Sequence, residues 1–115
     1  MSGRDSIAIS DNYAYIVRRD CSLIAFDVSI PSEPTMVSKW SPQTECTGHD
    51  IAVSRNYAHL ATGDGLFIID ISNPSAPTEV GRYTGGRVRC KSVAVSGNYV
   101  YLGAKNGLHI LSQIQ

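Results

Sequence analysis

The sequence predicts an all-β fold built from four-stranded antiparallel β-propeller blades, and three observations lead to this prediction. A unit of about 43 residues recurs along the chain, each complete unit holds four short strand-like segments, and the third segment is apolar on both faces. A repeat of about 40–45 residues with four strands per unit is typical of a propeller blade. About two and a half units are present, which predicts a partial propeller of about 2.5–3 blades.

The repeat is visible in both halves of the unit. Residues 7–10, 51–54 and 93–96 share the pattern Ile/Val-Ala-Ile/Val-Ser, and an Asn-Tyr pair follows each of them, at steps of 44 and 42 residues. Residues 26–35 match residues 69–78 at a step of 43. Coincidence cannot produce so many matches in register. We therefore assign residues 1–115 to a single propeller segment, with repeat one at 6–49, repeat two at 50–91 and a truncated repeat three at 92–115.

The four strands of a unit follow one another at regular turn signals. The Ile/Val-Ala run forms strand one, and strand two, for example residues 99–102, alternates a tyrosine-bearing face with an aliphatic one. Asp64-Gly65 makes a tight turn before strand three at 66–71, which is almost continuously apolar and must be covered on both faces. Strand four, at 78–83, follows a Pro-x-x-Pro turn. A β-sandwich is the alternative, but it does not require near-identical units.

Composition and charge narrow the function classes. Hydrophobic residues make up 43% of the chain, and ten Lys and Arg balance ten Asp and Glu. Zero net charge argues against a dedicated nucleic-acid binder. No apolar run approaches the roughly 20 residues that span a bilayer, and residues 1–6 lack the apolar stretch of a signal peptide. As given, the chain is expected to stay in the cytoplasm unless it was cut from a longer precursor.

The three cysteines, Cys21, Cys46 and Cys90, are interpreted as free thiols. An odd number cannot pair completely within one chain, and one disulfide plus a leftover thiol is the alternative. Cys46 and His49 form a C-x2-H pair, but a zinc site needs about four ligands and no second pair is present. Gly63 and Gly65 flank a turn with no helix after it that could hold phosphate. We therefore predict no metal and no cofactor.

Two motifs resemble those of a known family. S-G-N-Y-V-Y-L-G at 96–103 and D-G-L-F-I-I-D-I-S-N-P-S-A-P-T at 64–78 are similar to the LVIVD-repeat family of bacterial and archaeal β-propellers. The resemblance covers nearly the whole chain. It implies a propeller, an often surface-associated or secreted setting and a binding role, and it carries no set of catalytic residues. Repeat one departs at Cys21-Ser22, which stands where repeat two has Asp64-Gly65, and repeat three has Ser112 in place of aspartate.

Polar loops are expected to share one rim if strand one is innermost, as in similar propellers. Seven basic residues against five acids would give this rim a mild positive bias that attracts an anionic group, although ordinary solvated loops would look the same. The rim residues are Arg4, Asp5, Arg18, Arg19, Asp20, Glu45, His49, Asp50, Asp64, Arg87, Arg89, Lys91 and Lys105. The candidate ligand or partner contacts among them are Arg18, Arg19, His49, Asp50, Arg89 and Lys91.

The sequence offers no catalytic constellation, so we predict a non-catalytic binding or scaffold protein rather than an enzyme. His49-Asp50 is the one pair that resembles an acid–base site, but adjacent residues of a strand point to opposite faces and no nucleophile accompanies them. One alternative is a lectin-like propeller with a pocket in each blade, although the equivalent residues Asp5, His49 and Lys91 do not match. The other is a hydrolase or lyase around His49, Asp50 and Lys91 at the channel mouth.

Assembly is the last expectation. Two and a half blades cannot close a ring, since closed propellers have about four to eight. Apolar flanks are expected to be exposed around Leu23, Ile24 and Phe26 in the first blade and around Leu108, Ile110 and Leu111 in the last. Copies would then join head to tail as a dimer or trimer that completes a ring. Other partners are a protein or a glycan, with no nucleic acid and no membrane span.

Overall fold

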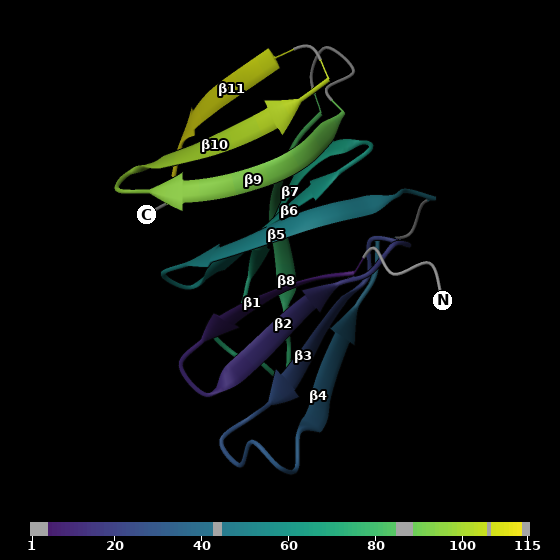
Figure 1. Cartoon of the computed structure of the whole chain (residues 1–115), viewed down its shortest axis with the longest axis vertical. Coiled ribbons are helices and arrows are strands. Elements are labelled where there is room, and N and C mark those ends of the chain that lie inside the picture. The colour runs from purple at the N-terminus through teal and green to yellow at the C-terminus, as the bar shows by residue number, and fades with distance from the viewer. Residues whose placement is uncertain (1–4, 43–44, 85–88, 106, 114–115) are drawn as a thin grey trace.

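The computed structural model describes residues 5–42, 45–84, 89–105 and 107–113, and this part of the chain is all β. It forms three antiparallel sheets, here called blades 1, 2 and 3 (Figure 1). Blade 1 consists of β1 (Ser6–Ser10), β2 (Tyr13–Val17), β3 (Leu23–Asp27) and β4 (Thr35–Trp40). Blade 2 consists of β5 (Gly48–Ser54), β6 (Tyr57–Thr62), β7 (Gly65–Asp70) and β8 (Thr78–Tyr83), and blade 3 of β9 (Cys90–Ser96), β10 (Tyr99–Ala104) and β11 (Gly107–Ser112).

Each blade is a meander in which every strand pairs with the next one along the chain. The blades stack along the long axis of the molecule, and β5 contacts both β1 and β9 (Figure 1). The first strands of the three repeats therefore lie side by side on the inner side of a partial propeller. The predicted fold class is confirmed by this arrangement.

Local sequence explains where strands turn. The two-residue turns after β1, β5 and β9 begin at Asp11, Arg55 and Gly97, whose φ angles are 53°, 58° and 57°. A positive φ at the first turn position closes a two-residue hairpin with the twist of its strands. After β3 and β7, the backbone N–H groups of Ser29 and Ser72 donate to the carboxylates of Asp27 and Asp70, at 2.9 and 2.8 Å. These bonds hold the turn that follows each of the two strands.

Two apolar cores lie between the blades. The first joins blades 1 and 2 and includes Val17, Leu23, Leu60, Phe67 and Ile69. The second joins blades 2 and 3 and includes Leu66, Val93, Val100 and Leu102. Neighbouring residues of β7 enter different cores, so the strand is covered on both faces, as its apolar sequence predicts.

The expected apolar flank of blade 1 was placed on the wrong residues. Leu23 belongs to the core between blades 1 and 2, Ile24 is buried and Phe26 is half-buried. The exposed apolar side chains of blade 1 are instead Ile7 and Ile9 on β1 and Met36 on β4. In blade 3, Leu108 and Ile110 are exposed as predicted, whereas Leu111 packs against the second core. Leu23 faces the opposite side of the sheet from Ile24, because consecutive strand residues alternate. Ile24 and Phe26 pair with Ile16 and Ala14 and so share the side of Ile7 and Ile9, but they are covered rather than exposed.

No helix within the described residues combines the length and the apolar character that a membrane crossing requires.

Candidate functional site

The rim is the edge of the molecule at which β5 and β9 begin and β10 ends. It also carries the turn between β6 and β7, and it lies on the right in Figure 1. All six predicted contact residues fall within described segments: Arg18 and Arg19 follow β2, His49 and Asp50 lie in β5, Lys91 lies in β9 and Arg89 directly precedes β9. Arg4 and Arg87, which were also expected on the rim, lie outside the described residues. The six residues do not lie together at one site in the structure.

A pocket of about 560 Å³ opens between the rims of blades 2 and 3. It brings together three of the predicted residues, His49, Arg89 and Lys91, and adds Lys105. The N–H of Lys105 donates to the carbonyl of Arg89 at 3.2 Å, which holds the two loops together. The remaining lining residues are Glu45, Cys46, Thr47, Gly63 and Asp64.

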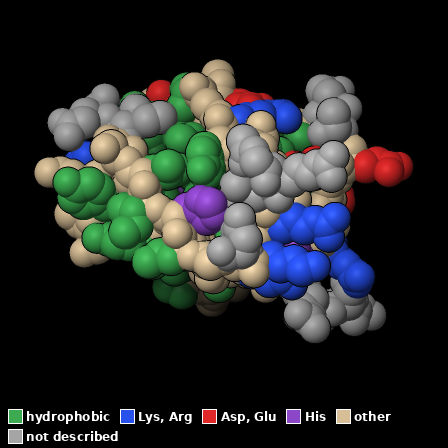
Figure 2. Space-filling view, turned by 90° about the horizontal axis from the view of Figure 1, so that it is seen from above, with side chains coloured by type: hydrophobic (Ala, Val, Ile, Leu, Met, Phe, Trp, Pro, Cys, Tyr) green, Lys and Arg blue, Asp and Glu red, His purple; other side chains and the backbone are tan. Residues whose placement is uncertain are grey.

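Basic residues outnumber acidic residues around this pocket. The basic residues Arg89, Lys91 and Lys105 face the acidic residues Glu45 and Asp64, and all three basic residues are exposed. On the face seen in Figure 2, lysine and arginine side chains gather at one end and hydrophobic side chains at the other. The pocket can therefore accept an anionic group, and its carboxylates can accept hydrogen bonds from the same ligand.

Arg19 lines a different, shallow hollow at the rim of blade 1, together with Asp20 and Ser41. Glu45, Cys46 and Thr47 line both hollows and therefore separate Arg19 from His49. Arg18 lines neither of them and forms an exposed ion pair with Asp5 at 3.7 Å. Such exposed pairs contribute little to stability. The structure therefore does not bring Arg18 and Arg19 into the pocket that His49 lines.

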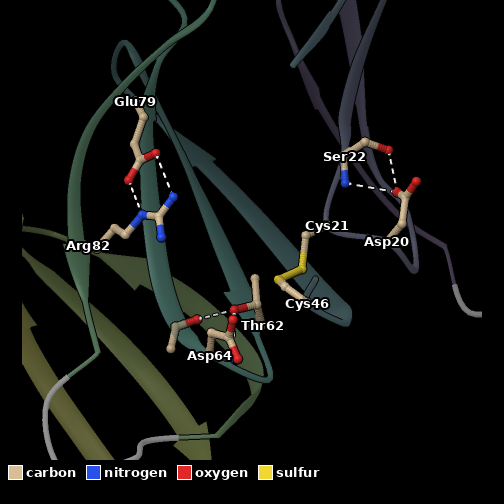
Figure 3. Close-up of a disulfide and its surroundings, with 9 residues drawn as sticks. Asp20, Cys21, Ser22, Cys46, Thr62, Asp64, Glu79 and Arg82 are labelled. Atoms are coloured by element: carbon tan, nitrogen blue, oxygen red, sulfur yellow. Dashed lines mark hydrogen bonds and ion pairs between the residues drawn. A yellow bond between two sulfur atoms is a disulfide. The ribbon is translucent and has the colours of Figure 1, made fainter. Parts of the chain in front are cut away.

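A disulfide joins Cys21 and Cys46, so the expectation of three free thiols was wrong (Figure 3). The Cα atoms are 5.8 Å apart. The loop that carries Cys21 is one residue longer than its counterpart in repeat two, and Cys21 adopts a φ of 68°. Closing a loop between residues 25 apart in sequence stabilises the fold by about 3–4 kcal/mol. The bridge also fixes the segment that lines both hollows to blade 1.

Cys90 is the remaining free thiol. It is buried in the core between blades 2 and 3, and this burial raises the pKa of its thiol. A thiol held in its protonated form is a poor nucleophile and a poor metal ligand. Cys90 therefore acts as a small core residue.

Short hydrogen-bonded turns hold two acidic residues of the rim, Asp20 and Asp64 (Figure 3). The N–H and hydroxyl of Ser22 donate to Asp20 Oδ1 at 3.0 and 2.5 Å, and these bonds lower the pKa of Asp20. Thr62 Oγ1 donates to the carbonyl of Gly65 at 2.8 Å and accepts from the N–H of Asp64 at 3.1 Å. The loop that carries Asp64 into the pocket is thereby fixed from within.

Asp50 lies between the first strands of the blades, a position that was not predicted from the sequence. Its Oδ1 accepts hydrogen bonds from Ser6 Oγ and from the N–H of Ile51, each at 2.9 Å. Its Oδ2 accepts from the N–H of Val93 at 3.0 Å. The half-buried carboxylate thus joins the first strands of all three blades. The repeat could have indicated this special role of Asp50, because the other two units have a serine at its position, Ser6 and Ser92.

Metal binding finds no support in the part of the chain that the structure describes: it contains no cluster of three or more His, Cys, Asp or Glu side chains that could hold an ion.

Comparisons with known proteins agree with the fold. Residues 4–41, 47–85 and 88–111 each match the model of the LVIVD repeat. Among solved structures, the chain is similar to the crystal structure of the computationally designed Ika4 protein, with a TM-score of 0.74 and 16% sequence identity. The match covers 93% of this chain and 64% of the Ika4 chain, and at this identity it shows the fold alone. No curated protein matches the chain.

Proposed function

Because the chain belongs to the LVIVD repeat family and is built from β-propeller blades, we propose that it is a non-catalytic binding or scaffold protein. Its binding site is the rim pocket between blades 2 and 3. The ligand contributes an anionic group, a carboxylate, sulfate or phosphate, carried by a partner protein or a glycan.

One observation carries this proposal: Arg89, Lys91 and Lys105 converge with His49 around a single pocket. Guanidinium and ammonium groups bind oxyanions through charge-assisted hydrogen bonds, which are about twice as strong as neutral ones. The neighbouring carboxylates of Glu45 and Asp64 disfavour a densely charged ligand and favour one that also carries hydrogen-bond donors. A carboxylate on a protein loop or an acidic sugar meets both conditions.

The repeat supports one site rather than one site per blade. Arg19, Gly63 and Lys105 occupy equivalent positions in the three units, as do Asp5, His49 and Lys91. These residues differ in charge from blade to blade, so equivalent pockets with the same specificity are not expected. A lectin-like protein with a pocket in each blade is therefore the weaker hypothesis.

A binding role also fits the position of Asp50. Its two carboxylate oxygens are engaged between the blades by Ser6, Ile51 and Val93. This assigns Asp50 to the scaffold and weakens the competing hypothesis of a hydrolase or lyase around His49, Asp50 and Lys91. Turnover of ester or glycoside substrates that is lost in His49→Ala would favour that hypothesis instead.

The Cys21–Cys46 disulfide bears on the setting in which the protein binds its partner. Disulfides persist in oxidising compartments and are rare in a reducing cytosol. This favours an extracytoplasmic setting, as the family resemblance implies.

The test is a binding screen against acidic and neutral glycans and against acidic and basic peptides. Lys91→Ala and Lys105→Ala should each weaken binding of an anionic probe about tenfold, as expected for a lost charge-assisted hydrogen bond. Lys39→Ala is the matched control, because Lys39 is an exposed lysine on β4 outside the pocket. Equal losses in all three variants, or preferential binding of basic probes, would contradict the proposal. Binding of neutral glycans that is sensitive to His49→Ala would favour the lectin alternative.

A further inference from the structure

The outward side of blade 3 is an apolar surface. Tyr99 on β10 and Leu108 and Ile110 on β11 are 49%, 66% and 53% exposed. Strand alternation and pairing place the three side chains on one side of the sheet, since Tyr101 pairs with Ile110 and Gly103 with Leu108. Figure 2 looks at the molecule from the end where blade 3 lies, and hydrophobic side chains gather over part of that view. We call Tyr99, Tyr101, Leu108 and Ile110 the front of blade 3.

The same positions are covered in the other two blades. Leu108 corresponds in the repeat to Leu23 of blade 1 and Leu66 of blade 2, which are 1% and 0% exposed. Leu23 lies in the core between blades 1 and 2, and Leu66 lies in the core between blades 2 and 3. In both cases the next blade along the chain provides the cover. The front of blade 3 is thus one half of a contact that the chain already makes twice.

The other half of that contact lies at the opposite end of the chain. Ile51 and Val53 of β5 help cover blade 1, and Val93 and Val95 of β9 help cover blade 2. Their counterparts in the first unit are Ile7 and Ile9 on β1, which are 59% and 62% exposed. We call Ile7 and Ile9 the back of blade 1.

Opposite charges at the rim would also meet if the front of blade 3 contacted the back of blade 1. Inside the chain, the carbonyl of Arg19 accepts a hydrogen bond at 2.9 Å from the N–H of Gly48, the residue before His49. In the repeat, Lys105 stands at the position of Arg19, and Asp5 stands at the position of His49. Stacking blade 3 on blade 1 of another copy would therefore bring Lys105 near Asp5, a pair of opposite charges.

We propose that the front of blade 3 binds the back of blade 1 in a second copy of this chain. The contact is head to tail, so each copy keeps one free front and one free back until a ring closes. Two copies bring six sheets, twice the three of one chain, within the four to eight of known propellers. Within the described residues β11 pairs only with β10, so this end of the sheet also has an open edge, which favours association.

The experiment is light scattering coupled to size exclusion, on the 115-residue chain at tens of micromolar. The unmodified chain should have the mass of a discrete oligomer. Ile9→Asp and Ile110→Asp, one on each surface, should each abolish it and give a monomer. Ile30→Asp is the matched control, because Ile30 is 56% exposed in the loop between β3 and β4, and this variant should keep the oligomer. Far-UV circular dichroism confirms that each variant is folded, and Ile7→Asp and Leu108→Asp serve as replacements for any variant that is not.

Mixing the two variants identifies the polarity of the contact. Ile9→Asp retains an intact front and Ile110→Asp retains an intact back, so an equimolar mixture should give a one-to-one complex that neither forms alone. An unmodified chain that is monomeric at tens of micromolar would overturn the proposal. An oligomer abolished by only one of the two substitutions would also overturn it, because that result indicates like surfaces in contact or a different interface.

Discussion

His59 is a polar side chain in a position that the other repeats fill with tyrosine. It corresponds to Tyr15 and Tyr101 and is fully buried on β6. Neither ring nitrogen has a hydrogen-bond partner of good geometry among the described residues. Burial lowers the pKa of His59 below its ordinary value, and the backbone of Ala52 offsets this only in part. The imidazole is therefore held neutral between the blades.

The pH dependence of stability follows from this lowered pKa. An unfolded histidine has a pKa of about 6.5, so between that value and the lower folded pKa the unfolded chain binds more protons. The free energy of unfolding should be unaffected by His59 above this window, fall as the pH falls through it and level off below it. Urea melts across this range should show a smaller fall for His59→Tyr than for the unmodified chain. Identical pH profiles would mean that His59 is protonated equally in both states.

At the scale of single elements, two hairpin glycines differ only in their surroundings. Gly65 begins β7 and Gly107 begins β11, with φ angles of 122° and 123°. A Cβ atom at Gly65 would lie 2.2 Å from the carbonyl oxygen of Tyr83 on β8. A Cβ atom at Gly107 would have no described atom within 4 Å. The fourth strand of blade 2 accounts for the difference.

Alanine at the two positions should therefore have unequal effects. Gly107→Ala introduces only backbone strain at positive φ and should lower the free energy of unfolding by about 1–2 kcal/mol. Gly65→Ala adds a steric clash and should cost at least about 1 kcal/mol more. Thermal or urea melts of the two variants measure the difference. Equal losses would indicate that β8 moves away from β7 without penalty.

The strands could be predicted from the sequence because the repeat gives their positions and alternation. Asp27 and Asp70 recur at the same position of two units, and this recurrence indicates a structural role in the turn. Alternation shows that Leu23 and Ile24 face opposite sides, but not which side meets the next blade, because both sides of a blade are apolar. Leu23 was assigned to the open flank of blade 1 for this reason.

The candidate site could be predicted only as a set of rim residues. Which of them share a pocket depends on the path of the loop that carries Cys46, and the disulfide sets that path. Cys21 has no cysteine counterpart in the other units, so the repeat could not indicate its partner. Lys105 was on the predicted rim, but its contact with Arg89 depends on the distance between the β10–β11 hairpin and the segment that precedes β9. Charge alone does not reveal that distance.

At the scale of the whole molecule, the blades form a linear stack with two separate cores. In stacked repeats, stability is approximately a sum of the units and of their nearest-neighbour interfaces. The core between blades 1 and 2 contains Phe67, whose ring meets Trp40 edge to face at a centroid distance of 6.3 Å. The core between blades 2 and 3 shares none of its fully packed residues with the first. The two interfaces could therefore separate independently unless something couples them.

Asp50 supplies that coupling, and its consequence is cooperative unfolding. The carboxylate bonds to Ser6 in blade 1 and to Val93 in blade 3, so losing either interface leaves it partly unsatisfied. Asp50→Ala should cost about 2–4 kcal/mol, because N–H groups lose a charged acceptor. The substitution should also split the single unfolding transition into two. Trp40 is the single tryptophan, and its fluorescence reports only on blades 1 and 2. Circular dichroism reports on every strand, so the two signals should no longer coincide. Asp27→Ala, which removes an exposed turn carboxylate, should leave both signals coincident. We therefore expect the three blades to unfold as one unit when Asp50 is in place, and blade 3 to open first as a separate unit when Asp50 is removed.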